Sequence, residues 1–193
     1  MILAAGESRR MNTPKALLPY RGSTFAAHLV QATRHPRVGV TRVVIGANAS
    51  AIRERLQVDP SFVIENPDWQ HGPLSSIQAA IRSLPAGETD GLILCPVDHP
   101  LISAELVGKL IDSFDSTRCA IALPAYHGRR GHPTIFRATL YEELLDASPE
   151  VGARQVVREH EGEITLVPTE EEGVVLNLND PQTLKRALDS RAS

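Results

Sequence analysis

The sequence lacks the features that mark several special classes of protein. It has only two cysteines, Cys95 and Cys119, both in apolar runs, so we expect buried strand thiols rather than a disulfide framework. No stretch approaches the roughly 20 apolar residues that a membrane-spanning helix needs, and the first residues lack the layout of a signal peptide. The sequence therefore predicts a cytoplasmic protein that does not enter a membrane.

Charge and motif content remove further classes. The net charge of −3 gives no basic excess, which argues against nonspecific binding of nucleic acid. The phosphate loop Gly-x-x-x-x-Gly-Lys-Ser/Thr and the dinucleotide loop Gly-x-Gly-x-x-Gly are both missing. There is no Gly-x-Ser-x-Gly elbow for a covalent serine mechanism, and the seven histidines lack the spacing of a metal site. An apolar content of 42% is nevertheless ordinary, so the chain can form a core without metals or disulfides.

What the sequence does contain is an alternation of short β-like runs with helical patterns. Strands are predicted at 1–4, 42–45, 62–65, 91–95 and 120–124, and helices at 25–33, 50–57, 74–84 and 104–114. After residue 125 the order is less regular, with strands at 134–136, 164–168 and 174–178 and helices near 139–145, 153–159 and 181–188. This alternation predicts an α/β fold, a Rossmann-like three-layer sandwich with a mostly parallel sheet. No repeat or long linker divides the chain, so we expect a single domain over 1–193.

The most informative segment is Leu-Ala-Ala-Gly-Glu-Ser-Arg-Arg-Met-Asn-Thr-Pro-Lys, at residues 3–15. Its small residues let backbone N–H groups approach a ligand closely, and a turn of this kind can surround phosphate oxygens. Arg10 and Lys15 then supply positive charge about where a polyphosphate would lie. The segment therefore predicts a phosphate-binding loop.

Two further segments contain oxygen ligands. Asp98 follows the apolar run 91–95, and the carboxyl end of a buried parallel strand is where doubly wound sheets bind ligands, so it is well placed to hold Mg²⁺. An ordinary strand-end turn is the alternative. Near the C-terminus, Asn179 offers a neutral oxygen ligand. Asp180 and Pro181 are typical of the first residues of a helix, and both interpretations can hold together.

Two loops complete the set of candidate functional segments. In 66–77 a Pro- and Gly-containing loop leads into a helix whose first turn has two serines, and free N–H groups and hydroxyls there can bind a base edge or an anion. Trp69 in this loop is expected to be a packing anchor. In 126–133 two arginines and two histidines lie among glycines, which suits an anionic acceptor or, alternatively, a solvated basic turn.

These five segments, in this order, resemble those of the MobA- and MocA-like nucleotidyltransferases, which include the molybdenum-cofactor cytidylyltransferases. The opening run is similar to Leu-Ala-Ala-Gly-x-Ser-x-Arg-Met-Gly-x-Pro-Lys, residues 98–100 match Asp-x-Pro, and 128–133 resembles Gly-x-x-Gly-His-Pro. The resemblance implies a fold of the nucleotide-diphospho-sugar transferase type, with a nucleotide-binding half at 1–125 and an acceptor-side half at 126–193. It also suggests a few more apolar residues before Met1, because a first strand normally needs about five residues.

The resemblance implies a Mg²⁺-dependent transfer of CMP from CTP to the phosphate of molybdopterin, with release of pyrophosphate. A molybdoenzyme or its chaperone is then a candidate partner. The catalytic residues would be Arg10, Lys15 and Asp98, and the metal ligands Asp98 and Asn179. Nucleotide binding would fall to Leu3, Ala4, Ala5, Gly6, Ser8, Asn66 and Ser76, and acceptor binding to Arg130 and His132.

Two residues, Asn12 and Asn179, depart from the family pattern, and a third, Ala5, bears on the choice of nucleotide. Asn12 stands where the family has Gly, and we expect it to adopt the positive φ required there. Ala5 favours CTP over the GTP of guanylyl-transferring relatives. Asn179 replaces an Asp, which is consistent with a sugar- or alcohol-phosphate nucleotidyltransferase. A non-catalytic pterin-cofactor carrier is the last alternative, and the full set of Arg10, Lys15 and Asp98 argues against it.

Overall fold

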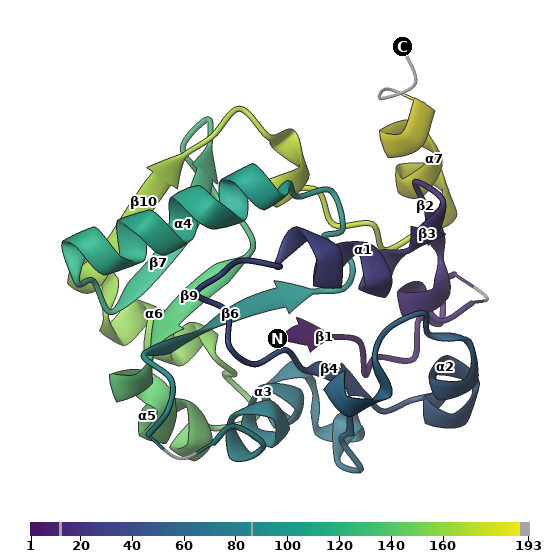
Figure 1. Cartoon of the computed structure of the whole chain (residues 1–193), viewed down its shortest axis with the longest axis horizontal. Coiled ribbons are helices and arrows are strands. Elements are labelled where there is room, and N and C mark those ends of the chain that lie inside the picture. The colour runs from purple at the N-terminus through teal and green to yellow at the C-terminus, as the bar shows by residue number, and fades with distance from the viewer. Residues whose placement is uncertain (12, 86, 190–193) are drawn as a thin grey trace.

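The computed structural model describes residues 1–11, 13–85 and 87–189, so the prediction for Asn12 lies outside the described residues. It has a mixed α/β fold in which a twisted, mostly parallel sheet is covered by helices on both faces (Figure 1). The predicted fold class is therefore confirmed. In the described part of the chain, no helix combines the length and apolar character needed to cross a membrane.

The central sheet has the order β10-β7-β9-β6-β1-β4-β5, with β8 paired to β7. Only β9 and β8 run antiparallel to their neighbours. The bounds are β1 Ile2–Leu3, β4 Val43–Ile45, β5 Val63–Glu65, β6 Gly91–Pro96, β7 Ile121–Tyr126, β8 Arg129–Arg130, β9 Thr134–Arg137 and β10 Ile164–Pro168. A separate small hairpin is formed by β2 Pro19–Tyr20 and β3 Ser23–Thr24. Because β1 lies between β4 and β6, the loops that follow these three parallel strands meet at one edge of the sheet.

Helices form the two outer layers. Their bounds are α1 Phe25–Ala32, α2 Ala49–Arg55, α3 Pro73–Arg82, α4 Ala104–Thr117, α5 Tyr141–Asp146, α6 Arg154–Glu159 and α7 Pro181–Asp189. The apolar residues of α1 and α4 share one core cluster, and those of α3, α5 and α6 share another, on the opposite face of the sheet (Figure 1). Successive residues of β6 alternate between these clusters, Leu94 in one and Cys95 in the other. A strand buried on both faces reads as a continuous apolar run, which is the pattern that the sequence has there.

Helix starts follow the local sequence. Thr24 caps α1 by accepting a hydrogen bond from Ala27 N (3.3 Å), and Ser103 caps α4 by accepting from Leu106 N (3.0 Å). Pro73 occupies the first turn of α3, where its missing N–H has no intrahelical partner to lose. The sequence predicts these boundaries well because a cap is a contact between residues three apart.

The predicted strand at 174–178 is wrong. Val174 ends a 3₁₀ turn (Glu172–Val174), and the residues after it have no regular structure. Val174 O accepts from His132 N (2.9 Å), whereas Leu178 N donates to Asp98 O (2.8 Å), so the segment bonds to two different loops rather than to one strand. Both side chains are fully buried. A short apolar run reports burial and does not by itself distinguish a strand from an irregular buried segment.

Two smaller differences concern neighbouring segments. Cys95 lies in β6 as expected, but Cys119 is buried just before β7 and not within a strand. The loop expected at 126–133 contains the two-residue strand β8, which folds back on β7. Such a short hairpin has too few residues to show the period-2 alternation by which strands are recognised.

Candidate active site

The opening loop is fixed at the carboxyl end of β1. Ala4 N donates to Val44 O (2.8 Å), and Ala5 O accepts from Ala47 N (2.9 Å), so the loop continues along the end of β4. On the other side, Leu3 O accepts from Val97 N (3.0 Å) beyond β6. The predicted nucleotide-binding residues Leu3, Ala4 and Ala5 thus lie against the ends of two parallel strands, and Gly6 is exposed beyond them.

Ser8 closes this loop. It has a positive φ of 57°, and its hydroxyl accepts a hydrogen bond from Lys15 N (2.9 Å). The bond joins the two ends of the turn and sets where the Lys15 side chain begins. In the structure Ser8 therefore positions Lys15, and its contact with a nucleotide stays a prediction.

Trp69 packs beside the loop, as predicted for a packing anchor. It belongs to a small cluster with Ala5 and Val44. Gly46 leaves the room for it, because an added Cβ at Gly46 would lie 2.5 Å from the Trp69 Cβ and 2.9 Å from the Ala5 Cβ. The absence of a side chain at Gly46 therefore lets the indole approach the loop closely.

Lys15, Asp98 and Asn179, which lie far apart in the sequence, meet at one point. The Lys15 ammonium is 3.2 Å from Asp98 Oδ2, and it also donates to Asn179 Oδ1. The Lys15 and Asp98 side chains are only 14% and 21% exposed, so the pair is partly shielded from water. Two predicted metal ligands and one predicted phosphate-binding cation are thus brought together.

This arrangement fits a divalent metal. Asp98 and Asn179 direct a carboxylate and an amide oxygen to one point, and in the structure a positive group, the Lys15 ammonium, lies between them. Mg²⁺ prefers such oxygen ligands and commonly keeps waters and substrate phosphate oxygens as the rest of its shell. Within residues 1–11, 13–85 and 87–189 no three His, Cys, Asp or Glu side chains form a metal cluster, so a metal here needs further oxygens from substrate or water.

Arg10 and Asp180 lie at the same end of the sheet. Asp180 caps α7 by accepting from Gln182 N (3.0 Å) and Thr183 N (2.9 Å), so the capping interpretation of this residue is confirmed. The backbone and hydroxyl of Thr183 are the main cause of its lowered pKa, and the positive charge of Arg10 adds to it. Arg10 itself is exposed and available to a ligand.

Asn66 and Ser76 form a buried brace. The Asn66 side-chain amide donates to Ser75 Oγ (2.9 Å) and Ser76 Oγ (3.0 Å), and its oxygen accepts from Asp68 N (3.0 Å). Asn66 is 2% exposed and Ser76 3%. These bonds stabilise the loop between β5 and α3, and a direct contact of either residue with a nucleotide stays a prediction. Ser75, which the sequence analysis did not single out, is the more accessible of the two serines.

The two predicted acceptor residues have different surroundings. Arg130 is exposed in β8 and forms a two-pronged ion pair with Glu161, which raises the pKa of Arg130 and lowers that of Glu161. His132 lies beside His99 with ring centroids 4.8 Å apart. Burial is the largest cause that lowers the pKa of His132, to about 4, and burial also lowers the pKa of His99. Both imidazoles are therefore neutral at pH 7.

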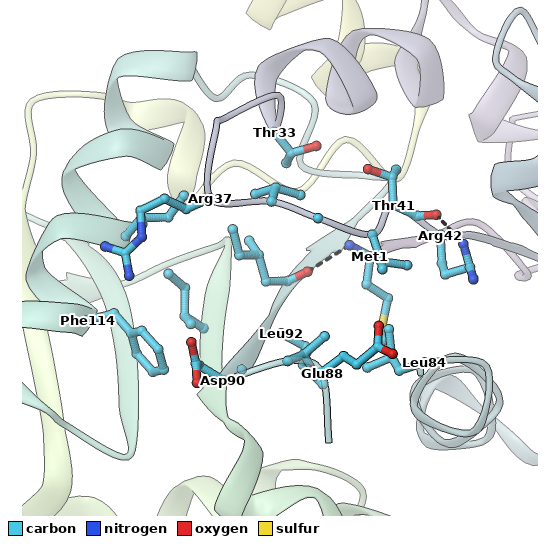
Figure 2. A pocket seen from close by; sticks show the side chains of 18 of the residues that line it. Met1, Thr33, Arg37, Thr41, Arg42, Leu84, Glu88, Asp90, Leu92 and Phe114 are labelled. Carbon is cyan, nitrogen blue, oxygen red and sulfur yellow. Dashed lines mark hydrogen bonds between the residues drawn. The ribbon is translucent and has the colours of Figure 1, made fainter. Parts of the chain in front are cut away.

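A separate cavity of about 300 Å³ lies at the other end of the sheet (Figure 2). Its lining includes Met1, Arg42 and Asp90, which precede β1, β4 and β6. The Met1 ammonium donates to Ile93 O (3.0 Å) there, and burial lowers its pKa. Ligands of doubly wound sheets bind outside the carboxyl ends of the strands, so this cavity is distinct from the candidate site.

The chain is similar to known proteins over most of its length. The model of the MobA-like NTP transferase domain matches residues 1–164. The chain is 30% identical to nicotine blue oxidoreductase of Paenarthrobacter nicotinovorans, covering 97% of this chain and 95% of that protein. It is 32% identical to the bifunctional protein GlmU of Azotobacter vinelandii over 78% of this chain, but spans only 34% of that relative.

A solved relative has a similar fold over nearly its full length. The crystal structure of Rv0371c from Mycobacterium tuberculosis H37Rv superposes with a TM-score of 0.82 at 26% identity, covering 97% of this chain and 95% of that one. A manganese complex of the same protein superposes with a TM-score of 0.78 at 25% identity, covering 98% and 96%. A divalent metal is thus present in a solved structure of a relative.

Proposed function

Because this chain belongs to the MobA-like NTP transferase family and is a nucleotidyltransferase, we propose that it transfers a nucleoside monophosphate, CMP from CTP, to the phosphate of molybdopterin, with Mg²⁺ as cofactor. The observation that carries the proposal is the meeting of Lys15, Asp98 and Asn179 beside the opening loop. That point is at the carboxyl ends of β1 and β6, where a nucleotide bound by the loop would place its phosphates.

In the proposed reaction a phosphate oxygen of the acceptor attacks the α-phosphorus of the nucleotide. A new P–O bond forms, the bond to the β-phosphate oxygen breaks, and pyrophosphate leaves with the electron pair. An acceptor phosphate is already ionised at pH 7, so no enzyme nucleophile or general base is required. Positioning and charge stabilisation then supply most of the rate enhancement.

The chain's own residues divide this work. Lys15 and Arg10 neutralise charge on the triphosphate, and the Ser8 hydroxyl holds the backbone of Lys15 in place. Asp98 and Asn179 would hold Mg²⁺, which when bound supplies further positive charge to the phosphate oxygens. On the acceptor side Arg130 would pair with the anionic acceptor in place of Glu161.

Two alternatives each change one part of this proposal, either the acceptor or the base of the nucleotide. A sugar- or alcohol-phosphate acceptor is consistent with Asn179 and with the similarity to GlmU. The other alternative is GTP in place of CTP. The Ala-Ala-Gly run at 4–6 supports CTP, because a methyl group at Ala5 would leave less room for a purine base.

The test is pyrophosphate release from each of the four NTPs with Mg²⁺, with and without molybdopterin or a panel of sugar phosphates. Release confined to CTP and the pterin is the expected result. Release with a sugar phosphate in place of the pterin would overturn the acceptor assignment. Asp90→Asn is the matched control, because Asp90 is a carboxylate at the opposite end of β6. A parallel assay for oxidation or reduction of nicotine blue covers the activity in the name of the Paenarthrobacter nicotinovorans relative.

A further inference from the structure

Glu171 is a half-buried carboxylate to which the proposed reaction assigns no role. It begins the Asn179 segment, residues 171–179, which connects β10 to α7 and passes the start of α4 (Figure 1). Both of its oxygens accept hydrogen bonds from Ser103, at the end of the Asp98 turn (residues 98–103). Oε2 accepts from Ser103 N (3.0 Å), and Oε1 accepts from the Ser103 hydroxyl. One carboxylate therefore joins the two segments that contain the proposed metal ligands.

The bond to the hydroxyl also makes Glu171 part of a helix cap. The Ser103 hydroxyl donates to Glu171 and accepts from Leu106 N (3.0 Å) in the first turn of α4. A hydroxyl has a single hydrogen, so its donation to Glu171 turns the oxygen lone pairs toward the helix amide. A negative charge is favourable at the N-terminus of a helix, and hydrogen bonds to a carboxylate are stronger than those between neutral groups. The contact is thus well suited to hold the start of the Asn179 segment.

Two backbone contacts continue the same junction. At Gly173 an added Cβ would overlap the carbonyl oxygen of Leu101, so the two backbones touch there. Further along, Leu178 N donates to Asp98 O (2.8 Å). The contacts advance along the Asn179 segment as they go back along the Asp98 turn, so the two irregular segments lie antiparallel and are joined at both ends.

The position of Asn179 depends on this junction. No ladder of strand bonds holds the residues before it, and the Asp180 cap that follows it bonds only to residues of α7. Leu178, its neighbour, is bonded to the residue that supplies the other proposed metal ligand. In the structure the side-chain oxygens of Asn179 and Asp98 meet at the Lys15 ammonium.

We propose that Glu171 is a positioning residue whose two bonds to Ser103 fix the Asn179 segment on the Asp98 turn and so set where the Asn179 oxygen lies relative to Asp98. Glu171 touches neither metal nor substrate in this assignment. Its effect on a metal rests on the proposed function, whereas the tie between the segments does not. Without the tie, a metal that needs both oxygens must itself order the Asn179 segment, and this cost weakens binding.

The first test is titration with Mn²⁺ in the absence of nucleotide, followed by water-proton relaxation. Glu171→Ala removes both bonds, and we expect about fivefold weaker binding, less than the roughly 10- to 100-fold lost with a direct partner of a metal ligand. Glu171→Gln keeps one accepting oxygen, so about twofold weaker binding is expected. Glu172→Ala is the control for charge, because Glu172 is the exposed neighbouring carboxylate. It should bind Mn²⁺ as wild type does.

The second test is amide hydrogen exchange at Leu178, whose N–H bonds to Asp98. This exchange should become about fivefold faster in Glu171→Ala and stay unchanged in Glu172→Ala. Thr24→Ala is the control for stability, because it removes a comparable cap from α1 and leaves the Asn179 segment intact. It should change neither the Leu178 exchange nor the Mn²⁺ affinity.

Each outcome supports or overturns a defined part of the proposal. Unchanged exchange at Leu178 in folded Glu171→Ala would overturn the tie. Faster exchange with unchanged Mn²⁺ affinity would refute its link to the metal. Equal losses of affinity in Glu171→Ala and either control would refute positioning in favour of charge or overall stability.

The failure of the proposed function would look different. If the wild-type protein binds no Mn²⁺, the proposed metal site is refuted, and the exchange at Leu178 still decides the tie. If Glu171→Ala fails to fold, Glu171→Asp serves in its place. It keeps the charge, but its shorter side chain does not reach Ser103, so the same two changes are expected.

Discussion

The two sides of the candidate site, the proposed nucleotide side and the proposed acceptor side, are held by different kinds of structure. On the nucleotide side, the opening loop and the Asp98 turn leave two adjacent parallel strands, β1 and β6, and ladder bonds fix their backbones. On the acceptor side, His132 and Asn179 belong to irregular segments that meet through single hydrogen bonds and close backbone approach at Val174. The comparison teaches that strand topology alone brings the first set together, whereas the second set depends on packing between distant loops.

The largest effect on turnover should follow from removing the charged side chains on the nucleotide side. We expect Asp98→Ala and Lys15→Ala each to lower turnover about 10²-fold or more, which corresponds to about 2.7 kcal/mol of transition-state stabilisation. Steady-state pyrophosphate release measures the turnover of each variant. Circular dichroism checks that the variants fold, and Asp90→Asn is the control. Near-normal turnover in a folded Asp98→Ala protein would refute its role as a metal ligand.

On the acceptor side, a single added methyl group at Gly131 should disturb the backbone packing and lower the stability of the protein. Gly131→Ala would place a Cβ 2.5 Å from the Val174 carbonyl oxygen, so we expect it to lower the free energy of unfolding by about 1–3 kcal/mol. Gly108→Ala, inside α4 with open space around it, should raise that free energy by about 0.5–1 kcal/mol. Urea unfolding of both variants measures the difference. Equal stabilities would show that the backbone contact between Gly131 and Val174 can move apart to accommodate the methyl group.

Metal binding without nucleotide should respond to Lys15 in the opposite direction from turnover. The Lys15 ammonium competes with a cation for the Asp98 and Asn179 oxygens. A like charge at about 4 Å costs about 1 kcal/mol even in water, so Lys15→Met should bind Mn²⁺ at least about fivefold more tightly. Titration with Mn²⁺ measures this, and Lys109→Met, which removes an exposed lysine from α4, is the control. Unchanged or weaker binding would show that the ammonium and the metal do not share these oxygens.

The smallest effects should come from the exposed ion pair at the acceptor side. Arg130→Ala should raise KM for the acceptor about threefold, whereas Glu161→Gln frees Arg130 and should lower that KM by a similar factor. Thermal stability should change little, because surface ion pairs contribute little. Kinetics at saturating nucleotide separates the two variants. A shift of KM in the same direction for both would remove Arg130 from acceptor binding.

Much of the fold was predictable because its signals are local. Alternating apolar runs and helical patterns gave most strands and helices, and caps such as Thr24 and Ser103 lie within three residues of the amides that they bind. The prediction of a strand at 174–178 failed because this segment is buried against two different loops. Val174 bonds to the loop of His132, and Leu178 bonds to the loop of Asp98. The apolar pattern of the segment reports that burial correctly but carries no information about hydrogen-bond partners.

The candidate site shows the same division between features that the sequence predicts and features that only the folded chain shows. The chemistry of Lys15, Asp98 and Asn179 follows from residue types and from their places after strands and before a helix. Their meeting at one point, and the position of the ammonium between the two oxygens, required the folded chain.

The sequence by itself determined the α/β class and supplied the predictions of a phosphate-binding loop and of oxygen ligands for a metal, since composition, periodicity and short motifs act over a few residues. Only the tertiary structure decided how Asn66 and Ser76 brace each other, how Arg130 pairs with Glu161, and how the Asn179 segment reaches Asp98. The physical reason is that each of these contacts joins groups whose separation along the chain is closed by packing. Backbone approach at Val174, tolerated by Gly131, is such a contact, and no local pattern encodes it.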